Sequence, residues 1–117
     1  MAEFTLYHNP MCSKSRATLA LLKGREVDLR IVEYLKAAPS AAELAAIVDK
    51  LGIRPEELVR KGEEVYRSRY AGKALSDREW IEAMIQDPIL IERPIVVAGA
   101  RAVMGRPPER ILRLLES

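Results

Sequence analysis

The chain has 117 residues and a formal net charge of +2, and 49% of its residues are hydrophobic and 31% charged. This length and composition are typical of one compact soluble domain, and they exclude a disordered chain. The longest apolar run is too short to cross a bilayer and no run of Lys and Arg marks a nucleic-acid tail, so neither a membrane nor nucleic acid is an expected partner.

A β-α-β unit is predicted at the start of the chain. Residues 4–7 alternate and are rich in strand formers, and they lead into a loop that ends at Cys12. From Ser13 onward the apolar residues have helical spacing, until Gly24 offers a C-terminal cap. A second strand over residues 27–31 is expected to lie parallel to the first, because such crossovers join parallel strands.

Helices are predicted between about residues 40 and 86. Capping boxes begin at Ser40 and Ser76, and each precedes apolar residues at helical spacing. Between them, Pro55 is expected to open a short helix that ends near Gly62. We interpret this block as an insertion into a single domain that spans residues 1–117.

The end of the chain predicts a hairpin and a closing helix. Residues 94–98 and 101–104 flank Gly99-Ala100, a two-residue link that is typical of an antiparallel hairpin. Two prolines, Pro107 and Pro108, then stand where the first turn of a helix tolerates them. The order β-α-β, helical insertion, β-β-α is the one that a thioredoxin-like fold would give, so we expect an α/β protein with a four-stranded mixed sheet.

Cys12 is the only cysteine, and its surroundings favour a reactive thiol over an inert buried one. The predicted turn places it at a helix N-terminus, where unpaired N–H groups and the helix dipole stabilise a thiolate. His8, Lys14 and Arg16 are near in sequence and could add positive charge, although His8 could equally be a structural residue of the turn. The Ser15 hydroxyl can donate a hydrogen bond to the sulfur or to a bound oxyanion.

A single thiol limits the chemistry. Ser15 occupies the position of the second cysteine in a C-x-x-C motif, so a thiol from outside the chain must complete any redox cycle. One Cys and one His cannot supply the ligands of a structural zinc site, so we expect no metal. A lone thiol and an N-terminus without signal-peptide features indicate a cytoplasmic protein.

Three motifs in order carry a family resemblance: residues 8–16 (His-Asn-Pro-Met-Cys-Ser-Lys-Ser-Arg), 92–97 (Glu-Arg-Pro-Ile-Val-Val) and 105–109 (Gly-Arg-Pro-Pro-Glu). Together they resemble the glutaredoxin-dependent arsenate reductases, over nearly the whole chain. The likeness is greatest to shorter bacterial members with a Cys-Ser-Lys-Ser-Arg motif. The better-known members carry Gly-Thr where this chain has Ser13-Lys14, which puts the anion preference in question.

The resemblance implies a mechanism and a set of site residues. Cys12 would attack arsenate, and Arg60, Arg93 and Arg106 would hold the oxyanion, because guanidinium groups bind tetrahedral anions well. Without the resemblance, Arg60 would be interpreted as a solvated residue of a charged stretch. Pro94 would be a cis proline beside Cys12. Glutathione would act as co-substrate and glutaredoxin as partner, with no bound cofactor.

Two other functions remain open on the sequence. One is a thiol oxidoreductase that acts on glutathione mixed disulfides, for which arsenate would be incidental. The other is a non-enzymatic regulator that binds RNA polymerase, a type of protein that the same fold family includes. That regulator senses oxidation through a C-x-x-C motif, and this chain has Ser15 in place of the second cysteine.

Overall fold

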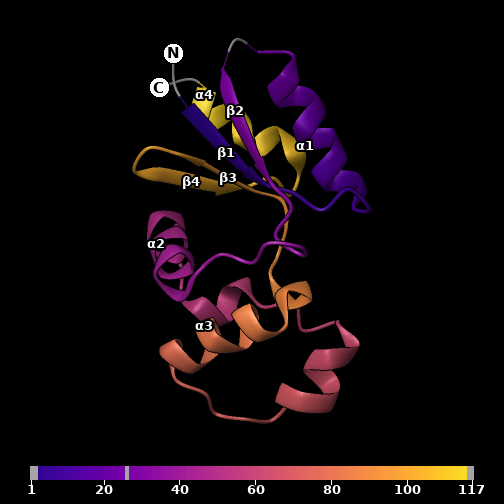
Figure 1. Cartoon of the computed structure of the whole chain (residues 1–117), viewed down its shortest axis with the longest axis vertical. Helices are drawn as coiled ribbons and strands as arrows, with labels where there is room; N and C mark the ends of the chain where they lie inside the picture. The colour runs from indigo at the N-terminus through magenta and orange to yellow at the C-terminus, as the bar shows by residue number, and fades with distance from the viewer. Residues whose placement is uncertain (1–2, 26, 116–117) are drawn as a thin grey trace. The chain divides into compact units, whose positions relative to one another are not determined.

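The computed structural model describes residues 3–25 and 27–115. By its internal contacts the chain divides into two compact units, one formed by residues 1–37 and 93–117 and the other by residues 38–92. Figure 1 follows the chain through both units. The helical insertion expected at about residues 40–86 falls within the second unit, and the interpretation of the whole chain as a single domain stays a prediction.

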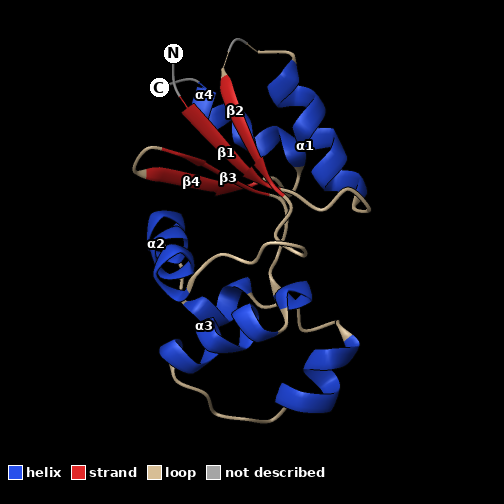
Figure 2. Cartoon of the chain, in the orientation of Figure 1, coloured by secondary structure: helices blue, strands red, loops and turns tan. Residues whose placement is uncertain are grey.

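A four-stranded mixed sheet forms the framework of the first unit (Figure 2). Its strands are β1 (Glu3–Tyr7), β2 (Asp28–Val32), β3 (Ile95–Ala98) and β4 (Arg101–Met104). The spatial order is β2-β1-β3-β4, with β2 parallel to β1 and the pairs β1–β3 and β3–β4 antiparallel. The predicted α/β class, the strand directions and the element order of a thioredoxin-like fold are confirmed.

Two helical segments pack on one face of this sheet. They are α1 (Ser13–Lys23), which connects β1 to β2, and the closing segment η4 (Pro108–Ile111) with α4 (Leu112–Leu115). Their buried side chains meet those of the central strands in one apolar cluster, which contains Phe4, Leu6, Leu22, Val96, Ile111 and Leu114. This packing holds the N-terminal end of α1 and the loop before it at the edge of a rigid layer.

The second unit consists of helices. Its α-helices are α2 (Ala41–Leu51) and α3 (Asp77–Gln86), and its shorter helical segments are η1 (Pro55–Leu58), η2 (Tyr66–Tyr70) and η3 (Pro88–Leu90). Both predicted capping boxes form: the Ser40 and Ser76 hydroxyls accept from the backbone N–H groups of Glu43 and Glu79. Trp80, only 2% exposed, lies against Tyr66 and Tyr70 in the core of this unit.

The short helix that begins at Pro55 ends at Leu58, and the prediction that it reaches Gly62 is wrong. The reason is tertiary, because the next residues pair with a distant segment as extended chain. The N–H of Arg60 donates to the carbonyl of Leu90 at 2.7 Å, and the N–H of Glu92 donates to that of Leu58 at 2.9 Å. Within the described residues no helix has the length and apolar composition that crossing a membrane requires.

Candidate active site

Cys12 is the N-cap residue of α1 and lies at the end of the loop that leaves β1. Its backbone is extended, with φ −97° and ψ 123°, as N-cap residues usually are. Its carbonyl already accepts the first helical hydrogen bond, from the N–H of Arg16 at 3.0 Å. The sulfur therefore lies where the first N–H groups of the helix have no partner within the helix.

The Cys12 thiol is partly buried and is acidified by its neighbours. Burial by itself raises the pKa of Cys12, but hydrogen bonds from the backbone N–H groups of Ser15 and Lys14 and from the Arg93 side chain lower it, and the charge of Arg93 acts in the same direction. The net result is a pKa below the ordinary thiol value. These groups favour the thiolate because each places positive charge or a donor at the sulfur.

Asn9 organises the loop before the cysteine, and the sequence analysis missed it. It is 4% exposed, its side-chain Oδ1 accepts from the N–H of Met11 at 3.0 Å, and its carbonyl accepts from the N–H of Cys12 at 3.0 Å. An Asn that bonds the backbone two residues later is a recognised turn former, and the Asn-Pro pair at a strand end was the signal that could have found it.

Ser15 contributes through its backbone, which differs from the expected role of its hydroxyl. The Ser15 Oγ is buried, lies 2.7 Å from His8 Nδ1 and accepts from the N–H of Asn9 at 3.0 Å. The hydroxyl therefore ties the helix start to the cysteine loop, while the Ser15 N–H reaches the sulfur.

His8 does not add the positive charge that the sequence suggested. Burial lowers the pKa of His8, and the charges of Arg16 and Lys23 lower it further, against an opposing effect of Glu33. The lowered pKa favours the neutral form of the ring. Its bond to Ser15 makes it a structural residue of the turn, which was the alternative interpretation.

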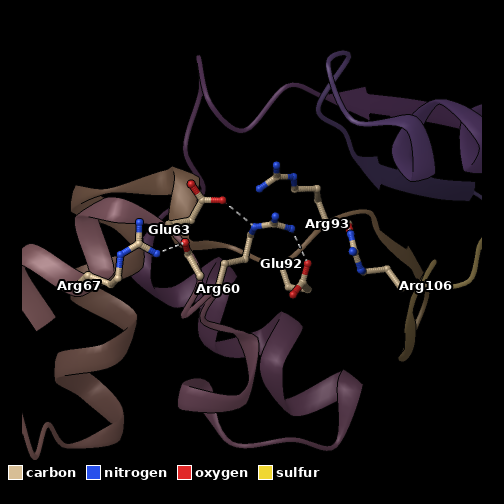
Figure 3. Close-up of polar contacts among 7 residues, drawn as sticks. Arg60, Glu63, Arg67, Glu92, Arg93 and Arg106 are labelled. Carbon is tan, nitrogen blue, oxygen red and sulfur yellow. Dashed lines mark hydrogen bonds and ion pairs between the residues drawn. The ribbon is translucent and has the colours of Figure 1, made fainter. Parts of the chain in front are cut away.

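Arg93 and Arg106 lie together, each directly before a cis proline. The peptide bonds Arg93–Pro94 and Arg106–Pro107 are both cis, and the first matches the geometry that the resemblance implied for Pro94. Arg106 Nη1 donates to the carbonyl of Arg93 at 3.0 Å, as Figure 3 shows. Because the Arg93 side chain also reaches the Cys12 sulfur, the first unit brings the thiol and these two arginines into one connected group.

Arg60 belongs to the second unit, where two carboxylates hold its guanidinium (Figure 3). Its Nε lies 3.1 Å from Glu63 Oε2 and its Nη1 lies 2.8 Å from Glu92 Oε1, and the side chain is 22% exposed. Burial lowers the pKa of Arg60, but Glu92 and Glu63 together raise it above the ordinary value. The alternative of a solvated residue is therefore wrong, because Arg60 is a half-buried member of an ion-pair cluster.

These features define a class of protein: a thioredoxin-like fold that presents one acidified thiol beside an arginine. The thiolate is a nucleophile, and a guanidinium next to it can receive an anion. Comparisons with known proteins place the chain more closely. The model of the ArsC family matches residues 7–114.

Similar proteins agree with this match over almost their whole length. An arsenate reductase of Haemophilus influenzae is 44% identical over 94% of this chain and 97% of its own. YfgD, an uncharacterised protein of Escherichia coli, is 45% identical over 94% of each chain. The solved structure of an arsenate reductase from Vibrio cholerae has a TM-score of 0.91 and 42% identity, and the match covers 96% of this chain and 97% of that one. The chain belongs to the ArsC family, the family of these arsenate reductases.

Proposed function

We propose that this protein is an arsenate reductase that uses Cys12 as its nucleophile and glutathione and glutaredoxin as its reductants. The observation that carries the proposal is the Cys12 sulfur at the N-terminus of α1, with its pKa lowered by two backbone N–H groups and by Arg93. Membership of the ArsC family and the name of the relative in Haemophilus influenzae support arsenate as the substrate.

In the proposed first step, the Cys12 thiolate forms an S–As bond with arsenate, and one arsenate oxygen leaves as water after taking up protons. Arg93 stabilises the negative charge that collects on the remaining oxygens. A guanidinium that is already held in place costs little free energy of reorganisation as this charge develops. Arg106, which bonds the carbonyl of Arg93, lies close enough to that residue to share this role.

In the second step, the glutathione thiol replaces a further arsenate oxygen, which also leaves as water. The two sulfurs on arsenic then join, and the electron pairs of the two S–As bonds become one S–S bond and one lone pair on arsenic. Arsenic(V) is thereby reduced to arsenic(III), released as arsenite, and Cys12 is left as a mixed disulfide with glutathione. Glutaredoxin removes the glutathione by thiol–disulfide exchange and frees the Cys12 thiolate.

Two details of the anion site rest on the resemblance. Arg60 is proposed to help bind the oxyanion, and its ion pairs with Glu63 and Glu92 fix the orientation of its guanidinium within the second unit. Lys14, where better-known members carry Thr, is exposed next to Cys12 and adds a cation that bears on anion preference. The proposed location is the cytoplasm, because a lone reactive thiol needs a reducing compartment.

The test is a coupled assay with glutathione, glutaredoxin, glutathione reductase and NADPH. We expect NADPH consumption that depends on arsenate, abolished in Cys12→Ser and reduced about a hundredfold in Arg93→Gln, in line with the loss of one charge-stabilising donor. Arg30→Gln serves as the matched control, because Arg30 is an exposed arginine of the same unit, on the edge strand β2. The control is expected to keep wild-type activity.

The same assay separates the alternatives. Turnover of a glutathione mixed disulfide without any response to arsenate would contradict the proposed substrate and indicate a general thiol oxidoreductase. Absence of all turnover, together with recovery of RNA polymerase subunits on the immobilised protein, would contradict enzymatic function and indicate the regulator.

A further inference from the structure

A groove beside the cysteine loop is not used by the chemistry described above. It has a volume of about 320 Å³, and all of its lining residues belong to the first unit. One wall is the loop from His8 to Met11, and the other consists of Glu33, Leu35 and Lys36, which follow β2. We call it the cysteine-loop groove, because its first wall ends at the residue before Cys12.

Each wall of the groove has an exposed apolar side chain, and the loop wall is held in place by buried residues. His8 and Asn9 are buried, and the N–H of His8 donates to the carbonyl of Val32 at 2.8 Å, which ties the two walls together through the backbone. Met11 is 86% exposed and Leu35 43% exposed. Together with Ile31 they are the exposed large hydrophobic side chains of the described residues, so two of these three line one groove. Apolar side chains gathered around a hollow are typical of a binding surface.

The outer wall adds one charge of each sign. Lys36 Nζ lies 3.6 Å from Glu33 Oε1, and the two side chains are 81% and 43% exposed. An exposed ion pair of this kind contributes little to stability, so either charge can exchange its partner for a ligand at small cost. A ligand end that itself carries an ammonium and a carboxylate would complement both charges at once.

We propose that the cysteine-loop groove binds glutathione, with the γ-glutamyl end at Glu33 and Lys36 and the cysteinyl part against Met11 and Leu35. The γ-glutamyl group carries an α-ammonium and an α-carboxylate, which match the Glu33–Lys36 pair, and a tripeptide is of a size that a groove of about 320 Å³ can hold. The groove borders the loop that leads to Cys12, so a tripeptide bound there would place its thiol on the side of that loop. This inference rests on the proposed function, for which it names the site of the second thiol.

The test uses S-methylglutathione, whose thioether cannot form a disulfide, and the intact wild-type protein. Titration followed by ¹H–¹⁵N NMR is expected to give saturable shifts centred on residues 8–11 and 33–36. Leu35→Ser is expected to weaken binding about fivefold through lost apolar contact. Glu33→Gln and Lys36→Gln are each expected to weaken it about two- to fivefold.

The matched control is Ile31→Ser. Ile31 is 43% exposed, as Leu35 is, but it lies on β2 outside the groove, so its substitution is expected to leave binding unchanged. The S-methyl form of Cys-Gly, which lacks the γ-glutamyl group, is expected to bind the wild-type protein more weakly than S-methylglutathione does. Its affinity for Lys36→Gln is expected to equal its affinity for the wild-type protein.

Several results would overturn the inference. They are shifts centred outside the groove, equal effects of Leu35→Ser and Ile31→Ser, or no tripeptide binding while added glutaredoxin alone perturbs the groove. Because no arsenate is present, failure of this test is distinct from failure of the proposed function. A protein that binds in the groove but does not reduce arsenate contradicts the activity only, and one that reduces arsenate without groove binding contradicts this inference only.

Discussion

At the scale of single residues, the acidity of Cys12 depends on donors from two distant parts of the chain. Ser15 and Lys14 supply N–H groups from the helix that Cys12 itself begins, while Arg93 comes from the segment before β3. The helical donors follow from the position of Cys12 as N-cap. The third donor exists only because β3 pairs with β1 and so brings its N-terminal end beside the C-terminal end of β1, where Tyr7 faces Ile95.

Titration of the thiol tests this arrangement. The rate of alkylation by iodoacetamide against pH is expected to have a midpoint below that of an ordinary thiol, and Arg93→Gln is expected to raise it. Arg30→Gln is again the control and is expected to leave the midpoint unchanged. A wild-type midpoint at the ordinary thiol value would contradict an activated centre.

The same shift predicts a pH dependence of stability. Because the pKa of Cys12 is lower in the folded chain than in the unfolded chain, ionisation of this thiol favours the folded state. The contribution is fully present above the ordinary thiol pKa and is lost as the pH falls through the lowered value. The difference in free energy of unfolding between wild type and Cys12→Ser, measured in urea across this range, is therefore expected to grow with pH.

Asn9 is expected to act as a positioning residue. In Asn9→Ala the N–H of Met11 loses its acceptor, which is expected to lower the free energy of unfolding by about 1 kcal/mol. Because the same turn places Cys12, the midpoint of thiol alkylation is expected to rise as well. A variant that loses stability with no change in this midpoint would show a purely structural role.

At the scale of elements, Gly105, directly after β4, lies tightly against α1 and the start of the segment that leads into β3. A Cβ at this position would lie 2.5 Å from Thr18 Oγ1 and 2.9 Å from Pro94 Cγ. Neither neighbour can move easily. Thr18 is fully buried, and its hydroxyl donates to the carbonyl of Lys14. Pro94 is buried as well, and its backbone carbonyl accepts from the N–H of Gly105. The close contact therefore requires glycine.

Gly105→Ala is expected to lower the free energy of unfolding by about 1–3 kcal/mol, as overpacking of a rigid site does. Gly62→Ala is the control, since a Cβ at Gly62 would meet nothing within 4 Å. Urea unfolding followed by circular dichroism measures both. Equal stability of the two variants would contradict the close packing of α1 against the segment after β4.

At the scale of the whole molecule, the chain passes from the first unit to the second near residue 37 and returns near residue 93. The prediction of a single domain requires both units to unfold in one transition. Trp80, the only tryptophan, reports on the second unit, and circular dichroism reports on both. Gly105→Ala is therefore expected to shift two urea midpoints by the same amount, that of the Trp80 fluorescence transition and that of the circular dichroism transition.

Ser76→Ala provides the complementary perturbation in the second unit. Loss of this N-cap is expected to cost about 1 kcal/mol and to shift both signals together. Two separate transitions, or a Trp80 signal that responds to Ser76→Ala but not to Gly105→Ala, would show that the units unfold independently.

The sequence by itself determined the elements whose signals are local. Alternation predicted the first two strands, the Gly99-Ala100 link predicted the hairpin, and capping boxes at Ser40 and Ser76 predicted helix starts, because each depends on neighbours within a few residues. The strand-to-helix turn likewise predicted the local part of the acidity of Cys12, which comes from the N–H groups of Lys14 and Ser15. Family motifs added the cis bond at Pro94 in the same way, as a pattern around one residue.

Only the tertiary structure decided the properties that depend on contacts between distant segments. Pairing of residues 58–60 with 90–92 ended the helix at Leu58, and burial lowered the pKa of His8, which disfavours the positive charge expected there. Strand pairing brought Arg93 to the Cys12 sulfur, and the carboxylate of Glu92 engaged Arg60 across the sequence. Burial and long-range hydrogen bonds set these outcomes, and neither is a function of local spacing.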